Sequence, residues 1–274
     1  MKTIQKPRIF SCIEPALQYV KDRQLKTALL NALSNQEKAI ATIEGTFGKL
    51  TTQKWPEETF KFFFNAWKAT HLKMLAIYGL SCRLQRMALE ESDDPGKQHE
   101  LLLAAAKNAE TSYEDLGLDF DGETHTKLYH DLAESFVSDD SWTLDKWSIP
   151  EANAFKEFVY RNMVVENIQV GLFTNMFSEI YNHAEYTVAL SAFNELIDAH
   201  YDFVPDEKKK TTTYIFAHLE DETELNHFSV VIDSLNYYAK AENTAIDYEL
   251  AQRTFETYLL KMARVFEQIN LKLS

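Results

Sequence analysis

Helix-breaking residues are scarce in this chain of 274 residues, and their scarcity limits the possible folds more than any other feature. Only seven glycines and six prolines are present, and nearly all lie between long stretches in which apolar residues recur with the helical period. No stretch shows convincing strand-type alternation of apolar and polar residues. The sequence therefore predicts an all-α protein. Because 45% of the residues are hydrophobic, we expect a full core in a single domain over residues 1–274.

The helical patterns follow one another closely along the chain. We expect helices over residues 15–45, 56–91, 97–116, 122–137, 151–168, 171–201, 206–240 and 245–272. The helix over 56–91 carries four large aromatic residues at helical spacing: Phe60, Phe63, Phe64 and Trp67. Such a stripe predicts that this helix is central and largely buried.

Charge and cysteine content limit the possible partners and compartment. The formal net charge is −14, and the only basic cluster is the run 208–210. This argues against nucleic acid or an anionic membrane as a partner and favours a small molecule. No apolar run is long enough to span a bilayer, and residues 1–20 lack the apolar core of a signal peptide. Because Cys12 and Cys82 are the only cysteines, we expect a soluble protein of the reducing cytoplasm.

The segment FAHLEDETELNHF, residues 216–228, places acids and histidines inside a helical pattern. If residues 213–240 form one helix, Glu220, Glu224 and His227 lie within about 60° of one another on its apolar face. Three other polar residues then point elsewhere: His218, Glu222 and Asn226. Two carboxylates facing apolar neighbours beside an imidazole require a compensating cation. The segment therefore predicts a metal site, although a solvated acidic face is the simpler alternative.

Another acid lies on the helix over 171–201. Glu185 shares its face with a set of mostly small residues, Ser178, Tyr181, Ala189 and Ala192. Small residues around one buried acid leave a space, so we expect these four to line a substrate pocket. Glu179 lies about 120° away from that face and is the weaker candidate.

Two further candidates flank the connection between neighbouring helices. Glu114 lies at the end of the helix over 97–116, and His125 lies at the start of the next. A turn between the helices can bring this pair together. Glu110 lies one helical turn before Glu114 and could replace it.

The candidate ligands form a recognisable set. They are four carboxylates and two imidazoles: Glu114, His125, Glu185, Glu220, Glu224 and His227. This is the ligand inventory of a carboxylate-bridged di-iron or di-manganese centre, whereas zinc more often has thiolate ligands or a His-rich set. The ferritin-like version needs Glu-x-x-His on two helices, and only Glu224 and His227 have that spacing here. We therefore expect a different helical scaffold.

Two stretches of the sequence resemble a known family. The run NAETSYEDLG, followed shortly by HTKLYHDL from His125, resembles the glutamate, turn and His-x-x-Leu signature of the heme-oxygenase-like di-iron oxidases. The last metal-binding helix of that family usually reads His-x-x-x-Asp-x-x-His. Here the corresponding positions are Glu220, Glu224 and His227, so the spacing is kept while glutamate replaces the first histidine. The resemblance covers about residues 56–240.

The resemblance implies a heme-oxygenase-like helical bundle that holds two irons per chain, with manganese as an alternative. Members of this family activate dioxygen to oxidise small amines, amino acids or fatty acids, and a homodimer is common among related folds. The resemblance implies that the six candidate ligands hold the metals. Glutamate at position 220 adds negative charge, which should favour the oxidised metal, alter metal choice or abolish the second site.

Two other classes of protein fit the same pattern. One is a metal-free enzyme of the same architecture, similar to the thiaminase-type or pyrroloquinoline-quinone-synthesis branches, with acids and histidines in proton transfer. The thiaminase-type branch uses a nucleophilic cysteine, and Cys82 has no obvious base near it in the sequence. The other class is a non-catalytic helical protein that binds a partner through an amphipathic helix.

Overall fold

The chain folds into a bundle of α-helices. A computed structural model describes residues 6–71, 73–91, 93–113, 116 and 122–274. The α-helices are α1 (Arg8–Ala16), α2 (Arg23–Asn35), α3 (Glu37–Leu50), α4 (Glu57–His71), α5 (Met74–Glu90), α6 (Pro95–Glu110), α7 (His125–Glu134), α8 (Pro150–Val164), α9 (Ile168–His200), α10 (Pro205–Ala217), α11 (Thr223–Ala241) and α12 (Tyr248–Lys272). Short 3-10 helices lie between them: η1 (Leu17–Tyr19), η3 (Asp140–Thr143), η4 (Asp145–Trp147) and η5 (Glu220–Glu222). No described residue lies in a β-strand, so the all-α prediction is confirmed.

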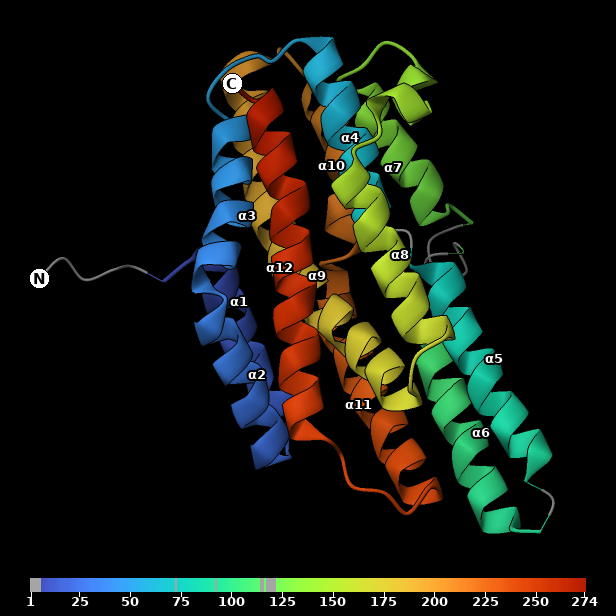
Figure 1. Cartoon of the computed structure of the whole chain (residues 1–274). Helices are drawn as coiled ribbons and strands as arrows, with labels where there is room; N and C mark the ends of the chain where they lie inside the picture. Colours follow the sequence, from blue (N-terminus) through green and yellow to red (C-terminus); the bar gives the residue numbers. More distant parts are fainter. Residues whose placement is uncertain (1–5, 72, 92, 114–115, 117–121) are drawn as a thin grey trace, which may run out of the picture.

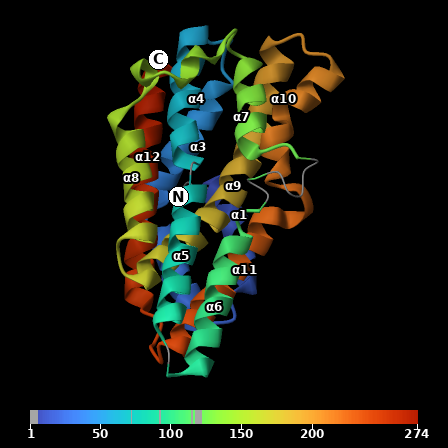
Figure 2. The ribbon, with the colours of Figure 1, turned by 90° about the vertical axis from the view of Figure 1, so that its right-hand side faces the viewer.

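Helix α9 forms the centre of the bundle. Most helices run along one long axis of the molecule, and α5 and α6 form a hairpin at one end, beside α11 (Figures 1 and 2). Helix α9 packs against α1, α3, α8, α10, α11 and α12. Most of its residues between Ile168 and Ile197 are therefore buried, whichever way they point. In the described part of the chain, no helix is both long and apolar enough to cross a membrane.

An aromatic core lies between α4 and the central helix. Phe60, Phe63, Phe64 and Trp67 of α4 are at most 1% exposed, and Trp67 stacks on Phe193 of α9 with ring centroids 5.8 Å apart. The prediction of a buried central helix is confirmed for this segment. Because these rings fill the space between α4 and α9, the two helices are closely packed here.

Two of the long predicted helices are divided in the structure. The pattern over 15–45 is covered by the end of α1, then η1, α2 and α3. Helix α2 starts anew because the Asp22 carboxylate accepts hydrogen bonds from the backbone N–H groups of Gln24 and Leu25. The pattern over 56–91 is divided into α4, which ends at His71, and α5, which begins at Met74.

The segment predicted as one helix over 213–240 also breaks, and this break shapes the site. Asp221 and Glu222 adopt left-handed backbone conformations, with φ of 49° and 57°. The turn is held by hydrogen bonds from the Thr223 hydroxyl to the Glu220 carbonyl and from the Asn226 amide to the Asp221 carbonyl. The prediction of one helix is wrong, and residues before the break point in other directions than a continuous helix would give. Two such residues cost about 1–2 kcal/mol each, and strain of this kind often accompanies function.

Candidate functional site

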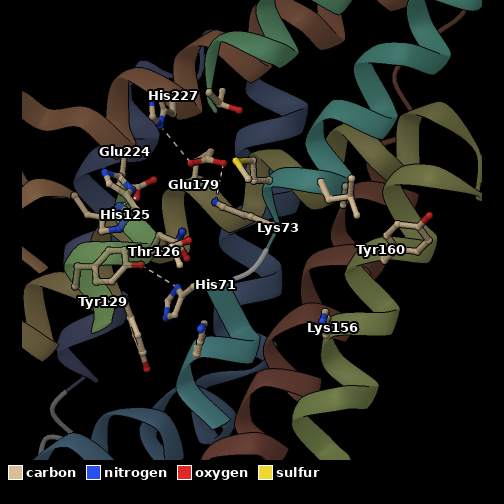
Figure 3. A pocket seen from close by; sticks show the side chains of 18 of the residues that line it. His71, Lys73, His125, Thr126, Tyr129, Lys156, Tyr160, Glu179, Glu224 and His227 are labelled. Atoms are coloured by element: carbon tan, nitrogen blue, oxygen red, sulfur yellow. Dashed lines mark hydrogen bonds and ion pairs between the residues drawn. The ribbon is translucent and has the colours of Figure 1, made fainter. Parts of the chain in front are cut away.

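One pocket lies among α4, α5, α7, α8, α9, α10 and α11, and its volume is about 620 Å³. This size fits a small organic molecule. Glu179, Glu224 and His227 lie together on one side of the pocket, where α9 faces α11 (Figure 3). The pocket therefore combines room for a ligand with groups that can carry chemistry.

Three ligand-type side chains converge on that side. Glu179 of α9 and Glu224 and His227 of α11 offer ligand atoms that all lie within 4.8 Å of one another. Glu224 and His227 share a face of α11 because they are three residues apart. The Nδ1 atom of His227 lies 3.6 Å from Oε2 of Glu179, and both glutamates are at most 2% exposed. These three residues form the candidate metal centre.

Lys73 provides a buried positive charge beside this centre. Its ammonium lies 2.8 Å from Oε1 of Glu179 and 3.0 Å from the Ser178 hydroxyl. Burial by itself would raise the pKa of Glu179. The Lys73 charge, followed by hydrogen bonds with His227 and Glu224, outweighs burial and holds that pKa well below its usual range. Glu179 is therefore a carboxylate at neutral pH.

His218 adds a second imidazole that the helical wheel had pointed elsewhere. Its Nδ1 lies 2.7 Å from Oε1 of Glu224, and its ring centroid lies 4.4 Å from that of His125. Burial and then the charge of His125 lower the pKa of His218 well below its usual value. A neutral ring donates its Nδ1 proton to Glu224 and keeps a lone pair on Nε2, and Nε2 accepts no hydrogen bond from any described residue. This is the arrangement of a metal-ligating histidine oriented by a carboxylate.

The left-handed turn explains why His218 replaces Glu220 at the site. In a continuous helix, position 220 lies one turn before position 224. The turn at Asp221 and Glu222 instead buries His218 in the pocket wall and leaves Glu220 exposed to solvent. No sequence signal fixed this choice, because aspartate and glutamate are ordinary residues inside a helix.

Glu185 lies in a different buried network. Its Oε1 accepts a hydrogen bond from the Trp67 indole and lies 3.4 Å from Nε2 of His71. Nδ1 of His71 pairs with the Tyr186 hydroxyl at 3.0 Å, which in turn lies 2.8 Å from the Tyr214 hydroxyl. The structure thus does not bring Glu185 together with Glu224 and His227, and Glu179, the weaker candidate, takes that place.

The residues expected to line a substrate pocket on α9 lie outside it. Ser178, Tyr181, Ala189 and Ala192 are all buried, and none lines the pocket. Tyr181 packs on Tyr258 of α12 with ring centroids 5.6 Å apart, and Ala192 lines a separate cavity toward α1 and α3. The small side chains on this face of α9 therefore do not provide room for a substrate beside Glu224 and His227.

The remaining candidates lie near the connection after α6. Glu114 lies outside the described residues. Glu110 forms an ion pair with Lys107 at 2.7 Å and does not line the pocket. His125, the first residue of α7, is buried in the pocket wall, where the Thr124 hydroxyl caps its helix. Of the predicted ligands that the structure describes, it thus places His125, Glu224 and His227 at the pocket.

The architecture is similar to that of a solved bacterial protein. No protein-family model and no curated protein sequence matches the chain. The crystal structure of a TenA homologue from Pseudomonas syringae pv. tomato matches with a TM-score of 0.63 over 90% of this chain and 93% of that one. The chain has the heme-oxygenase-like helical fold. Because the two sequences are only 12% identical, the likeness concerns the fold alone. The chemistry of this heme-oxygenase-like protein depends on the residues of its own pocket.

Proposed function

We propose that the protein is a non-heme iron enzyme that uses dioxygen to oxidise a small organic molecule. The observation that carries the proposal is the convergence of Glu179, Glu224 and His227 within 4.8 Å in the wall of a pocket of about 620 Å³. Two carboxylates and an imidazole form a donor set suited to Fe(II) or Mn(II), and the absence of thiolate disfavours softer metals. Heme-oxygenase-like architecture is consistent with this proposal.

The residues around this triad fit a metal centre. The unpartnered Nε2 of buried His218 is an atom that a metal would satisfy. His218 and neighbouring His125 bring the set to two carboxylates and three imidazoles, and we expect two irons per chain, with manganese as the alternative. Bound ferrous iron would supply electrons and open coordination positions for dioxygen.

The protein's own residues shape the surroundings of the reaction. Tyr186 stacks on His218 with ring centroids 4.1 Å apart and fixes the plane of that ring. Burial raises the pKa values of Tyr186 and Tyr129 well above the usual value, so both phenols stay protonated. Together with Trp67 behind them, these rings exclude water from one wall of the pocket. In the metal-free protein, Lys73 balances the charge of Glu179.

An anaerobic Fe(II) titration of purified protein tests the proposal. We expect about two irons per chain and a new optical absorption on admission of dioxygen. Glu179→Gln and His227→Ala should lose iron while keeping their helical circular dichroism spectrum. Glu220→Gln and Glu110→Gln serve as matched controls, because Glu220 is exposed and Glu110 pairs with Lys107. If the controls lose iron as readily as Glu179→Gln does, the metal centre is elsewhere.

A metal-free acid–base enzyme is the second candidate, and Lys73 is the observation that favours it. Its ammonium already compensates Glu179 at 2.8 Å, and His218 already pairs with Glu224 at 2.7 Å. Such pairs can transfer protons without a metal. Nucleophilic cysteine chemistry does not fit, because neither Cys12 nor Cys82 lines the pocket. Absence of bound iron, together with a small molecule that saturates the pocket, would favour this candidate.

A further inference from the structure

Two lysines line the pocket apart from the candidate metal centre. Lys68 comes from α4 and Lys156 from α8, whereas Glu179 comes from α9, and Glu224 and His227 come from α11. Figure 3 shows Lys156 and Tyr160 of α8 on the side of the pocket away from Glu224 and His227. A positive pocket wall is unexpected in a chain with net charge −14, and the groups that surround the two lysines determine what it can bind.

Lys68 is held in a fixed position. Its ammonium lies 3.0 Å from Nε2 of His130 and 4.9 Å from the ring centroid of Trp142. Trp142 is fully buried. Burial and then the charge of Lys68 lower the pKa of His130, so its ring is neutral and Nε2 can accept the lysine's hydrogen bond. Lys68 is thus a cation oriented by neutral groups rather than by an acid.

Lys156 places a second positive charge in the lining of the same pocket. Burial and then the charge of Lys156 lower the pKa of Lys68, as expected for like charges at one site. Within the described residues, neither lysine forms an ion pair with an acid. An anion that binds between these two ammonium groups is attracted by both.

Helix α8 presents a polar face to the same space. Asn153, Lys156, Glu157 and Tyr160 all line the pocket, and their spacing of three, four and seven residues places them on one side of the helix. Asn153 and Tyr160 offer an amide and a phenol that can hydrogen-bond a ligand's oxygen atoms. Glu157 is the one acid on this face. Its negative charge would repel a bound anion, so replacing it with a neutral residue should strengthen anion binding.

We propose that Lys68 and Lys156 bind the carboxylate of a small organic acid, whose other end extends across the pocket toward Glu179, Glu224 and His227. The inference rests on the proposed function for what happens to that acid, but binding itself needs no metal. An amine is a poor substrate on this assignment, because its cation would meet two lysines. A phosphate monoester presents similar anionic oxygens, so a phosphate probe has to be compared with a carboxylate probe of the same length.

Calorimetric titration of the metal-free protein tests the inference with three probes of equal chain length: octanoate, octyl phosphate and octylamine. We expect octanoate to bind best and octylamine at least about tenfold more weakly, because like charges are opposed. Lys156→Met should weaken octanoate binding about 3- to 10-fold, as expected for the loss of one hydrogen bond of ordinary strength at an exposed position. Glu157→Gln should strengthen it. Lys38→Met is the matched control, because Lys38 is an exposed residue of α3, and it should leave octanoate binding unchanged.

Several outcomes would overturn the inference. Octylamine binding as well as octanoate, or Lys156→Met binding octanoate as well as the unaltered protein, would show that the lysines do not select the ligand. A clear preference for octyl phosphate would overturn the carboxylate assignment. Lys156 is exposed, so its replacement should not unfold the protein even if Lys68→Met does. Because no metal is present, failure of iron to bind would leave these results standing and count only against the proposed function.

Discussion

At the scale of single residues, Lys73 is the buried cation on which the metal-free site depends. Lys73→Met keeps a side chain of similar length but leaves Glu179, which is 1% exposed, without its cation. We expect the metal-free protein to lose about 3–5 kcal/mol of unfolding free energy in urea denaturation, as when one partner of a buried ion pair is removed. The double variant Lys73→Met/Glu179→Gln should regain much of this loss. If Lys73→Met is as stable as Lys38→Met, the ion pair does not stabilise the site.

His218 gives the metal-free protein a defined pH dependence. Its folded-state pKa is well below the unfolded value of about 6.5, first because of burial and then because of the charge of His125. Below about pH 6.5, His218 takes up a proton in the unfolded chain but stays neutral in the folded protein. The stabilising contribution is therefore present above about pH 6.5 and is lost as the pH falls toward the folded-state pKa, by about 1.4 kcal/mol per pH unit.

Urea denaturation of metal-free protein at pH 7.5 and pH 5.5 measures this effect. His218→Gln should show a shallower decline in unfolding free energy than the unaltered protein, because one titrating group is gone. His99→Gln provides the control, because His99 is exposed and does not line the pocket. A steeper decline for His218→Gln than for the unaltered protein would mean that His218 is an imidazolium paired with Glu224 in the folded state, and identical declines would mean that its pKa does not change on folding.

At the scale of elements, the turn between α10 and α11 decides which side chains reach the pocket. Glu222 has φ of 57°, a conformation that glycine adopts without penalty and β-branched residues resist. We expect Glu222→Gly to be more stable than Glu222→Val by about 1–2 kcal/mol in urea denaturation. In a continuous helix the order would be reversed, because glycine is the poorer helix former. This comparison therefore tests the turn, and with it the position of His218.

The sequence could predict the helices but not the orientation of their buried polar residues. Periodicity identified the aromatic stripe of α4 because one face of that helix carries most of its large rings. The same reasoning preferred Glu185 to Glu179 on α9 without a sound basis, since both are buried and no solvent face sets the orientation of the helix. It also could not find His218, because no local preference of Asp221 and Glu222 predicts two consecutive left-handed residues there. Glu224 and His227 share a face, as their spacing indicates, because they lie on an unbroken stretch of α11.

At the scale of the whole molecule, the candidate ligands join separate helices, so metal should stabilise the entire bundle. Glu179 lies on the central helix α9, while Glu224 and His227 lie on α11, which packs against both α9 and α6. An ion that binds only the folded protein adds about 2.7 kcal/mol at a hundredfold excess over its dissociation constant. For a chain of this size that corresponds to a rise in Tm of roughly 5–10 °C.

Thermal unfolding with and without anaerobic Fe(II) or Mn(II) measures this coupling. We expect the rise in the unaltered protein and in Glu220→Gln, and its loss in Glu179→Gln, whose amide is a weaker ligand of similar size. An equal rise in Glu179→Gln would place metal binding elsewhere on this acidic chain. Stabilisation that is lost in Glu179→Gln but kept in Glu220→Gln would instead mean that Glu179 binds the ion, and its loss in His227→Ala as well would mean that the ion bridges α9 and α11.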